Sequence, residues 1–160
     1  MDFSKEVQYR GIRHNVENDA PFIGAVVLAP YCRDHCEGCH NQHLKESPIL
    51  TDTYNNILDE IEEDSFNNGI ILGGLEWTDA PRGMYKLIRE AVRRNMNVFL
   101  YTYMTEEQFA NKFPSLYKKP IWIKFGKFDK DKKGHNVQHG IKLSTTNQHI
   151  KFLGGDKNGR

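Results

Sequence analysis

Apolar residues along the chain fall into two patterns, short continuous runs and stripes with a helical spacing. Short apolar runs between turn signals are typical of strands buried in a sheet. The runs lie at residues 23–29, 70–72, 98–103 and 120–125, with weaker candidates at 140–143 and 149–153.

The stripes predict amphipathic helices between these strands. One helix is expected over residues 51–63, and a second begins near Asp79 and Pro81. The apolar positions are Tyr54, Ile57, Leu58 and Ile61 in the first and Met84, Leu87, Ile88, Ala91 and Val92 in the second. The sequence from Thr105 to Gln108 is a capping box, which predicts a short third helix.

Strands that alternate with helices predict an α/β fold with right-handed crossovers. We expect an open partial (β/α) barrel of about five or six mostly parallel strands with flanking helices, because a closed eight-stranded barrel needs roughly 200 residues or more. The 160 residues show no repeat or linker. They therefore predict a single domain over 1–160, in which 1–15 and 154–160 are flexible or peripheral.

The composition is that of an ordinary globular protein, with 38% hydrophobic and 27% charged residues. The longest apolar stretch, residues 22–30, is too short to cross a bilayer, and the N-terminus has no apolar segment of the signal-peptide kind. Three clustered cysteines indicate metal binding in a reducing compartment. We therefore expect a cytoplasmic protein that does not contact membranes.

Charge is distributed unevenly: residues 1–80 carry 5 Lys/Arg and 15 Asp/Glu, whereas residues 81–160 carry 17 and 6. Such asymmetry can mark a partner surface. The lysine-rich stretch 118–133 carries no nucleic-acid motif. We interpret these charges as solvated and expect no nucleic-acid partner.

The cysteines carry the most specific chemical signal. Cys32, Cys36 and Cys39 have the spacing C-x3-C-x2-C and directly follow the first predicted strand. Three thiolates can hold three irons of a 4Fe-4S cluster and leave the fourth iron without a protein ligand. The alternative is a Cys3His zinc site, completed by His43 or His40.

A pair of glycines follows the second predicted strand. Gly73 and Gly74 allow the backbone to approach a ligand closely, and Glu76 supplies a carboxylate two positions later. Loops at the carboxyl ends of parallel strands meet at one edge of a sheet. A cluster and a small zwitterionic cofactor are therefore expected to face each other there.

With these two loops, the chain resembles the radical S-adenosylmethionine (SAM) enzymes, whose cluster motif is C-x3-C-x2-C. The resemblance implies that SAM chelates the open iron and that a Gly-Gly-Glu-Pro strand end binds its amino group. This chain instead reads Gly-Gly-Leu-Glu-Trp, so that Glu76 is displaced by one residue and Trp77 takes the place of proline.

Finer features resemble the activating proteins of anaerobic (class III) ribonucleotide reductase. Four stretches carry this likeness: Cys36 through His40 to Asn41, Tyr101-Thr-Tyr103, residues 123–128, and Ser144 to Gln148. Residues 17–21 depart from that family, which usually has Asn-Gly-Pro-Gly-x-Arg before the first strand.

The resemblance implies a 4Fe-4S cluster and SAM as cofactors, with no catalytic side chain beyond them. It implies SAM contacts from Gly73, Gly74, Glu76, His40, Thr102 and Asn147. The expected partners are a large glycyl-radical enzyme, most simply anaerobic ribonucleotide reductase, and reduced flavodoxin or a ferredoxin-type donor. The alternatives are another glycyl-radical enzyme, a small-molecule substrate such as a deazaguanine precursor, an electron-transfer module, and the zinc-binding module without catalysis.

Overall fold

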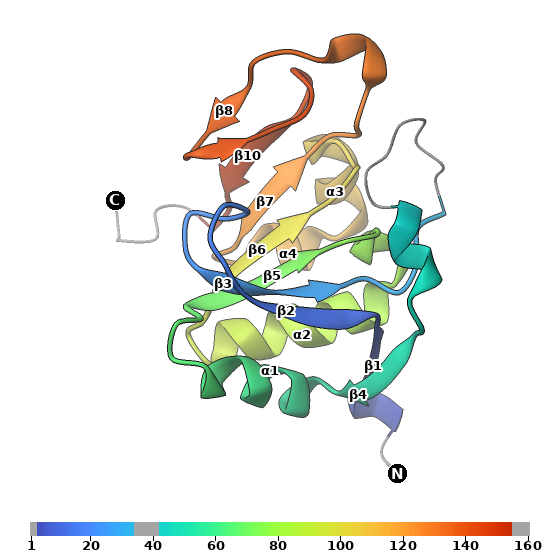
Figure 1. The fold of residues 1–160 in the computed structure, drawn as a ribbon, viewed down its shortest axis with the longest axis vertical. Coiled ribbons are helices and arrows are strands. Elements are labelled where there is room, and N and C mark those ends of the chain that lie inside the picture. The colour runs from blue at the N-terminus through green and yellow to red at the C-terminus, as the bar shows by residue number, and fades with distance from the viewer. Residues whose placement is uncertain (1–2, 34–41, 155–160) are drawn as a thin grey trace.

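A computed structural model of the chain describes residues 3–33 and 42–154. Its main sheet has six strands in the order β10-β7-β6-β5-β3-β2 (Figure 1). The strands are β2 (Gly11–Val16), β3 (Gly24–Leu28), β5 (Gly69–Gly73), β6 (Asn97–Tyr101), β7 (Trp122–Phe125) and β10 (His149–Phe152). The four inner strands are parallel, and β2 and β10 pair antiparallel at the two ends. The predicted α/β class, with an open and mostly parallel sheet, is confirmed.

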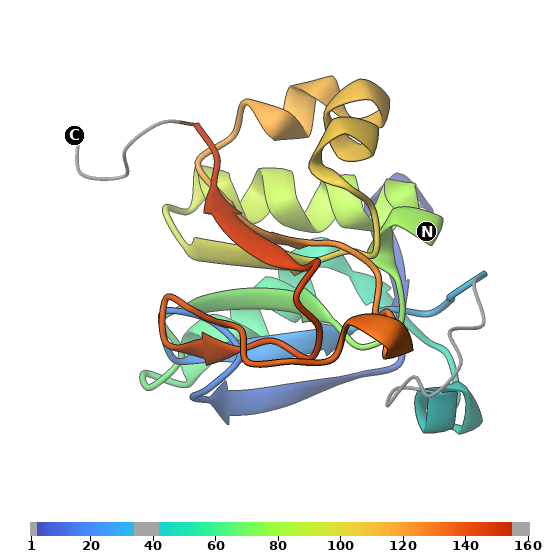
Figure 2. The same cartoon turned by 90° about the horizontal axis from the view of Figure 1, so that it is seen from above.

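The helices are α1 (Tyr54–Glu63), α2 (Pro81–Arg93), α3 (Glu106–Lys112) and α4 (Pro114–Tyr117). Figure 2 shows the yellow-green α2 and the gold α3 and α4 on one side of the sheet. The predicted capping box is present, since the side chains of Thr105 and Gln108 each accept a hydrogen bond from the other residue's backbone N–H. None of the helices in the described ranges is long and apolar enough to cross a membrane.

Strand residues alternate between the two faces of the sheet. Phe125 of β7 packs against Phe109 of α3, with ring centroids 5.8 Å apart, so this face is the helix-covered side. On the opposite face, Tyr101 donates a hydrogen bond to the backbone oxygen of Asp19 at 2.5 Å. Burial on both faces explains why the inner strands are continuous apolar runs.

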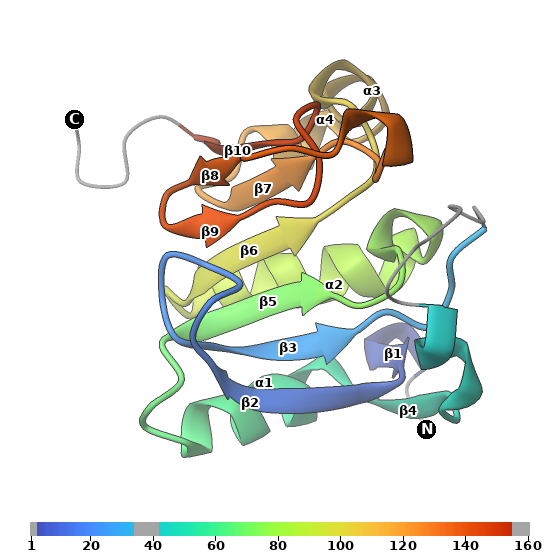
Figure 3. The same ribbon diagram turned by 45° about the horizontal axis from the view of Figure 1, so that its top comes forward.

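The C-terminal part of the chain covers the second face of the sheet. Strands β8 (Val137–Gln138) and β9 (Ile141–Lys142) form a hairpin that lies in front of β6 and β7 in Figure 3. His139, in the turn of this hairpin, packs edge-on against Trp122 of β7 at 4.9 Å. The predicted strand at residues 140–143 is thus confirmed as β9, but it belongs to this hairpin and not to the main sheet.

The N-terminal region contains strands that the hydrophobic pattern did not predict. β1 (Glu6–Tyr9) pairs antiparallel with β4 (Leu50–Thr53), and β2 closes one end of the main sheet. The expected helix at 51–63 therefore starts three residues late. Thr53 ends β4 and caps α1, because its hydroxyl accepts a hydrogen bond from the backbone N–H of Asn56 at 3.1 Å.

Short 3-10 helices complete the fold of residues 3–33 and 42–154, and two of them follow the cysteine and glycine segments. They are η1 (Phe3–Lys5), η2 (Gln42–Glu46), η3 (Trp77–Asp79) and η4 (Lys130–Lys132). Because β3, β5, β6 and β7 are parallel, the loops that follow them emerge at one edge of the sheet, on the right in Figure 3. This edge carries the candidate site.

Candidate functional site

The first cysteine lies just beyond the end of β3. Cys32 is half-buried and packs against the hydrophobic core. The other two predicted ligands, Cys36 and Cys39, lie outside the described residues, as does His40. The structure therefore fixes where the cysteine segment begins at this edge.

The Gly73-Gly74 segment runs beside the start of the cysteine segment. The backbone N–H of Ala29 donates to Gly73 O at 2.9 Å, and that of Glu76 donates to Tyr31 O at 2.8 Å. These two bonds continue the β3–β5 pairing past the ends of both strands. They hold the glycine segment against the residue that precedes Cys32.

Gly74 has a backbone conformation that other residues adopt only with strain. Its φ is +84°, and a Cβ at this position would lie 2.8 Å from Leu28 Cδ2 and 3.3 Å from Leu28 Cα. Gly73 is different, since its Cβ would meet only Val26 Cγ1 at 3.5 Å and Tyr101 Cδ1 at 4.0 Å. Gly74 is therefore required by packing, whereas alanine fits at Gly73.

Glu76 is buried and fully engaged within the protein. One carboxylate oxygen accepts from the backbone N–H of Tyr103 at 2.7 Å. The other accepts from the backbone N–H and the hydroxyl of Thr78, at 3.2 and 2.8 Å. Burial raises the pKa of Glu76, and these hydrogen bonds, with one from the Thr102 hydroxyl, oppose the rise. The carboxylate thus ties the loop after β5 to the loop after β6.

Thr102 and Trp77 are both core residues of this edge. Thr102 is 1% exposed, its hydroxyl accepts from Met104 N–H at 3.1 Å, and it also bonds Glu76. Trp77 is completely buried and donates its indole N–H to Val27 O at 3.0 Å. Trp77, which stands where the radical SAM motif has proline, therefore attaches η3 to β3.

Asp79 is a site residue that the sequence pattern identified only as a helix start. One carboxylate oxygen accepts from the backbone N–H of Arg33 at 2.8 Å, and the other accepts from the Tyr103 hydroxyl at 3.0 Å. Arg33 directly follows Cys32. Asp79 thus links the cysteine segment to the loop after β6, and only the tertiary contacts reveal it.

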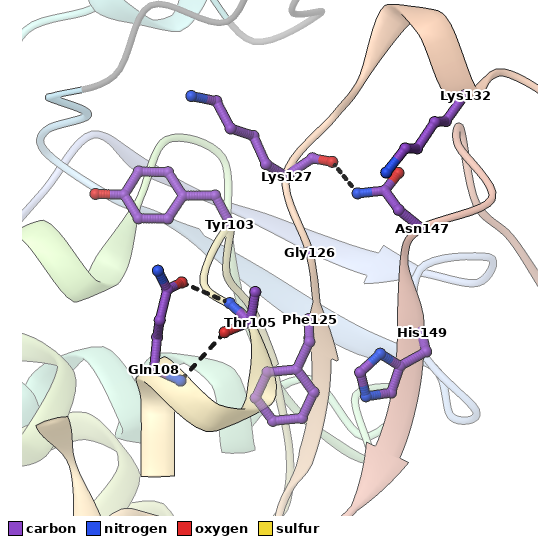
Figure 4. A pocket seen from close by; sticks show the side chains of 9 residues that line it. All are labelled: Tyr103, Thr105, Gln108, Phe125, Gly126, Lys127, Lys132, Asn147 and His149. Atoms are coloured by element: carbon purple, nitrogen blue, oxygen red, sulfur yellow. Dashed lines mark hydrogen bonds between the residues drawn. The ribbon is translucent and has the colours of Figure 1, made fainter. Parts of the chain in front are cut away.

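Asn147 lies in a pocket of about 550 Å³ beyond the ends of β6 and β7 (Figure 4). Its amide donates to Lys127 O at 2.8 Å and accepts from the Thr145 hydroxyl at 2.5 Å. Gly126 has a φ of +105°, and a Cβ added at this position would lie 3.1 Å from the backbone oxygen of Asn147, so the two segments pack closely here. The pocket is lined by Tyr103, Thr105, Gln108, Phe125, Gly126, Lys127, Lys132, Asn147 and His149.

Tyr103 joins this pocket to the glycine segment, because it lines the pocket and its backbone N–H bonds Glu76. The described lining includes Lys127 and Lys132 but no Asp or Glu side chain, and carboxylates lie just behind it: Lys132 Nζ is 3.9 Å from Asp129 Oδ2 and His149 Nε2 is 3.2 Å from Glu106 Oε1. The structure thus brings Gly73, Gly74, Glu76 and Thr102 together, with Asn147 on the far side of Tyr103.

Comparison with known families identifies the class of protein. Residues 21–151 match the family described as the 4Fe-4S single cluster domain, and the chain belongs to this family. No curated protein and no solved structure matches the chain. The matched range spans the cysteine segment, the glycine segment and the parallel strands β3, β5, β6 and β7.

The donor set suits the cluster that the family carries. Three thiolates on one segment can ligate three irons of a 4Fe-4S cluster, and Cys32 is held where the loops after the parallel strands meet. The family assignment favours this cluster over the Cys3His zinc site. His43, a candidate fourth zinc ligand, lies exposed on η2.

Proposed function

We propose that the protein is a radical SAM activase that generates a glycyl radical on a partner enzyme, with anaerobic ribonucleotide reductase as the expected partner. The observation that carries this proposal is the pairing of the cysteine segment with the Gly73-Gly74 segment. The bonds from Ala29 to Gly73 and from Glu76 to Tyr31 hold the glycine segment beside the residues that lead into the cysteine segment. A cofactor that chelates an open iron of the cluster would therefore lie next to a backbone suited to close approach.

The pocket next to Tyr103 supports a zwitterionic cofactor. In the proposal the SAM carboxylate lies against Lys127, Lys132 and the Gln108 amide, which line the pocket together with Asn147. Glu76 acts in this proposal by positioning the loops, since both of its oxygens are already bonded within the protein. In this proposal the SAM amino group lies against the backbone of the glycine segment, where the absence of side chains permits close approach.

Cys32, Cys36 and Cys39 would hold the cluster, and the chemistry that it would supply is one-electron reductive cleavage of SAM to methionine and 5′-deoxyadenosine, with the hydrogen atom taken from a partner glycine that is left as a glycyl radical. The electron would come from reduced flavodoxin or a ferredoxin-type protein. The chain's own residues would hold SAM next to the cysteine segment. The reaction needs no general base.

A macromolecular substrate is favoured by the shape of the sheet. β2 and β10 are its two ends and do not pair with each other, so the sheet stays open. An open barrel leaves the site accessible from one side, which suits an extended glycine-bearing loop of a large partner. A small-molecule substrate would instead need additional enclosing elements.

Anaerobic reconstitution followed by a cleavage assay tests the proposal. The protein is loaded with iron and sulfide, reduced with dithionite and incubated with SAM, and 5′-deoxyadenosine is quantified by chromatography. We expect product from the wild type and none from Cys36→Ala. A reconstituted, reducible cluster that yields no 5′-deoxyadenosine would contradict the activase and favour the electron-transfer module.

Two variants sharpen this experiment. Gly73→Ala adds a methyl group that the fold accommodates, so we expect a normal cluster and folding but weaker SAM binding, measured from the SAM-induced change in the EPR spectrum of the reduced cluster. His43→Ala is the control for the zinc alternative. It is expected to retain iron and sulfide fully, whereas loss of metal from this variant would support a Cys3His site.

The partner assignment needs a separate measurement. Incubation of the reduced protein with SAM and the candidate reductase is expected to produce a glycyl radical that EPR detects on the reductase. SAM cleavage without that radical would refute the reductase as partner while leaving the cleavage activity in place.

A further inference from the structure

Arg10 contacts both flanks of the cysteine segment. It lies in the turn between β1 and β2, and its backbone N–H donates to Leu28 O at 2.8 Å. Its Nε donates to Pro30 O at 2.9 Å, two residues before Cys32. Its Nη1 donates to Lys45 O at 3.0 Å and also to Ser47 O.

These acceptors are 15 to 17 residues apart along the chain, and one guanidinium joins them. The planar fork of arginine can bond several acceptors in different directions at once, which the single ammonium of lysine does less well. Pro30 leads out of β3, and Lys45 lies in η2. The Arg10 side chain therefore fixes the distance between the start and the end of the segment that carries all three cysteines.

A fixed pair of flanks bears directly on cluster binding. Three thiolates must be presented together for a cluster to be held, and closing a loop costs more entropy when its ends are free to separate. A residue that holds the ends together in advance lowers that cost before any iron is bound. Loss of the residue is expected to weaken the cluster more than the fold.

The charge of Arg10 adds a second effect. Its three side-chain acceptors are neutral backbone carbonyls, and no carboxylate is among its hydrogen-bond partners in the described chain. The guanidinium is half-buried, so its charge is screened less than that of an exposed arginine. Arg10 donates to Pro30 O, two residues before the first cysteine, so its positive charge would favour the reduced, more negative state of the cluster and raise its reduction potential.

We propose that Arg10 is a positioning residue for the iron–sulfur cluster: it clamps Pro30 to the Lys45–Ser47 stretch, slows cluster loss and raises the cluster's reduction potential. The proposal rests on membership of the 4Fe-4S family and not on SAM cleavage. Its tests measure cluster retention and potential, so their outcome is independent of the proposed activase function.

The experiment compares the reconstituted wild type with Arg10→Lys, Arg10→Met and the control Arg13→Met. Arg13 is an exposed arginine of β2, three residues away on the same segment. The rate of cluster loss in excess chelator is followed by visible absorption, and the midpoint potential by an anaerobic redox titration. Far-UV circular dichroism establishes that each variant is folded.

We expect both Arg10 variants to lose the cluster faster by about tenfold or more, because they lose charge-assisted hydrogen bonds to the two flanks. The potential is expected to fall in Arg10→Met and to stay near the wild-type value in Arg10→Lys, which keeps the charge. Arg13→Met is expected to match the wild type in both measurements.

Folded Arg10 variants that keep the cluster as long as the wild type would overturn the clamp. Equal acceleration in Arg13→Met would overturn it too, since the effect would then come from losing any positive charge on this segment. An unchanged potential in Arg10→Met would overturn the electrostatic part. If Arg10→Met does not fold, Arg10→Lys by itself decides the question of cluster retention.

Discussion

Replacing Gly74 with alanine is expected to be one of the more damaging single-methyl changes in this protein. The new Cβ would lie 2.8 Å from Leu28 Cδ2 and 3.3 Å from Leu28 Cα, in a buried part of β3. The residue would also have to keep a φ of +84°. The change therefore combines backbone strain with overpacking at the point where the glycine segment meets the strand that leads to Cys32.

The magnitude follows from these two contributions. A left-handed backbone costs a non-glycine residue roughly 1–2 kcal/mol, and an extra methyl group in a packed core costs about 1–3 kcal/mol. Gly140→Ala is the matched control, because Gly140 has a φ of +78° but nothing within 4 Å of an added Cβ. The entropy that alanine removes from the unfolded chain is similar at both positions and cancels in the comparison.

We therefore expect Gly74→Ala to lower the free energy of unfolding by about 1–3 kcal/mol more than Gly140→Ala does. Urea unfolding, followed by circular dichroism on anaerobically prepared protein, measures the difference. In the double variant Leu28→Ala/Gly74→Ala, the loss of stability is expected to be smaller than the sum of the losses in the two single variants, since alanine at position 28 removes the 2.8 Å contact with Cδ2. Equal stabilities of Gly74→Ala and Gly140→Ala would refute the reasoning, because the contact with Leu28 would then cost nothing.

Two further predictions concern carboxylates of the described structure. Glu76→Gln is expected to lower the free energy of unfolding by about 1–3 kcal/mol, because whichever way the amide turns, its NH2 group faces an N–H donor. Glu107→Gln, at an exposed position, is the control and is expected to change the free energy of unfolding little. Burial alone would raise the pKa of Glu106, but hydrogen bonds from Lys151 and its neighbours hold it at about 2, below the ordinary 4.5. The stabilisation by ionised Glu106 is thus present above pH 4.5 and lost as the pH falls toward about 2. Urea titrations across that window are expected to show that the free energy of unfolding depends less on pH in Glu106→Gln than in the wild type. An equal pH dependence in the two proteins would contradict the assignment.

Much of the fold could be predicted from the sequence because its signals are local. The apolar run at 23–29 became β3, the capping box from Thr105 opened α3, and the glycine pair at 73–74 ended β5. Each of these features depends on residues within one turn or one strand. The strands β1 and β4 were missed because each has a single partner far away in the sequence, and pairing rather than composition defines them.

The candidate site divides in the same way. Cysteine spacing and the glycine pair are visible in a single stretch of sequence, and the family match agrees with the cluster that the cysteines predict. That Glu76 bonds within the protein could not be predicted from the sequence, because its hydrogen bond from Tyr103 forms only when two strand ends meet. Asp79 likewise gained its role only through contacts with Arg33 and Tyr103.

The sequence by itself thus determined which groups are available to bind a cofactor: three thiolates on one segment that follows a strand, and a glycine pair at the end of the next predicted strand. The tertiary structure decided which residues support that chemistry, and Arg10 is the clearest case. Its acceptors lie 20 to 37 residues away, and no periodicity or motif marks such contacts in advance. The physical reason is that a hydrogen bond depends on distance in space, and Arg10 reaches the flanks of the cysteine segment only once β2 has paired with β3 and η2 has packed beside them.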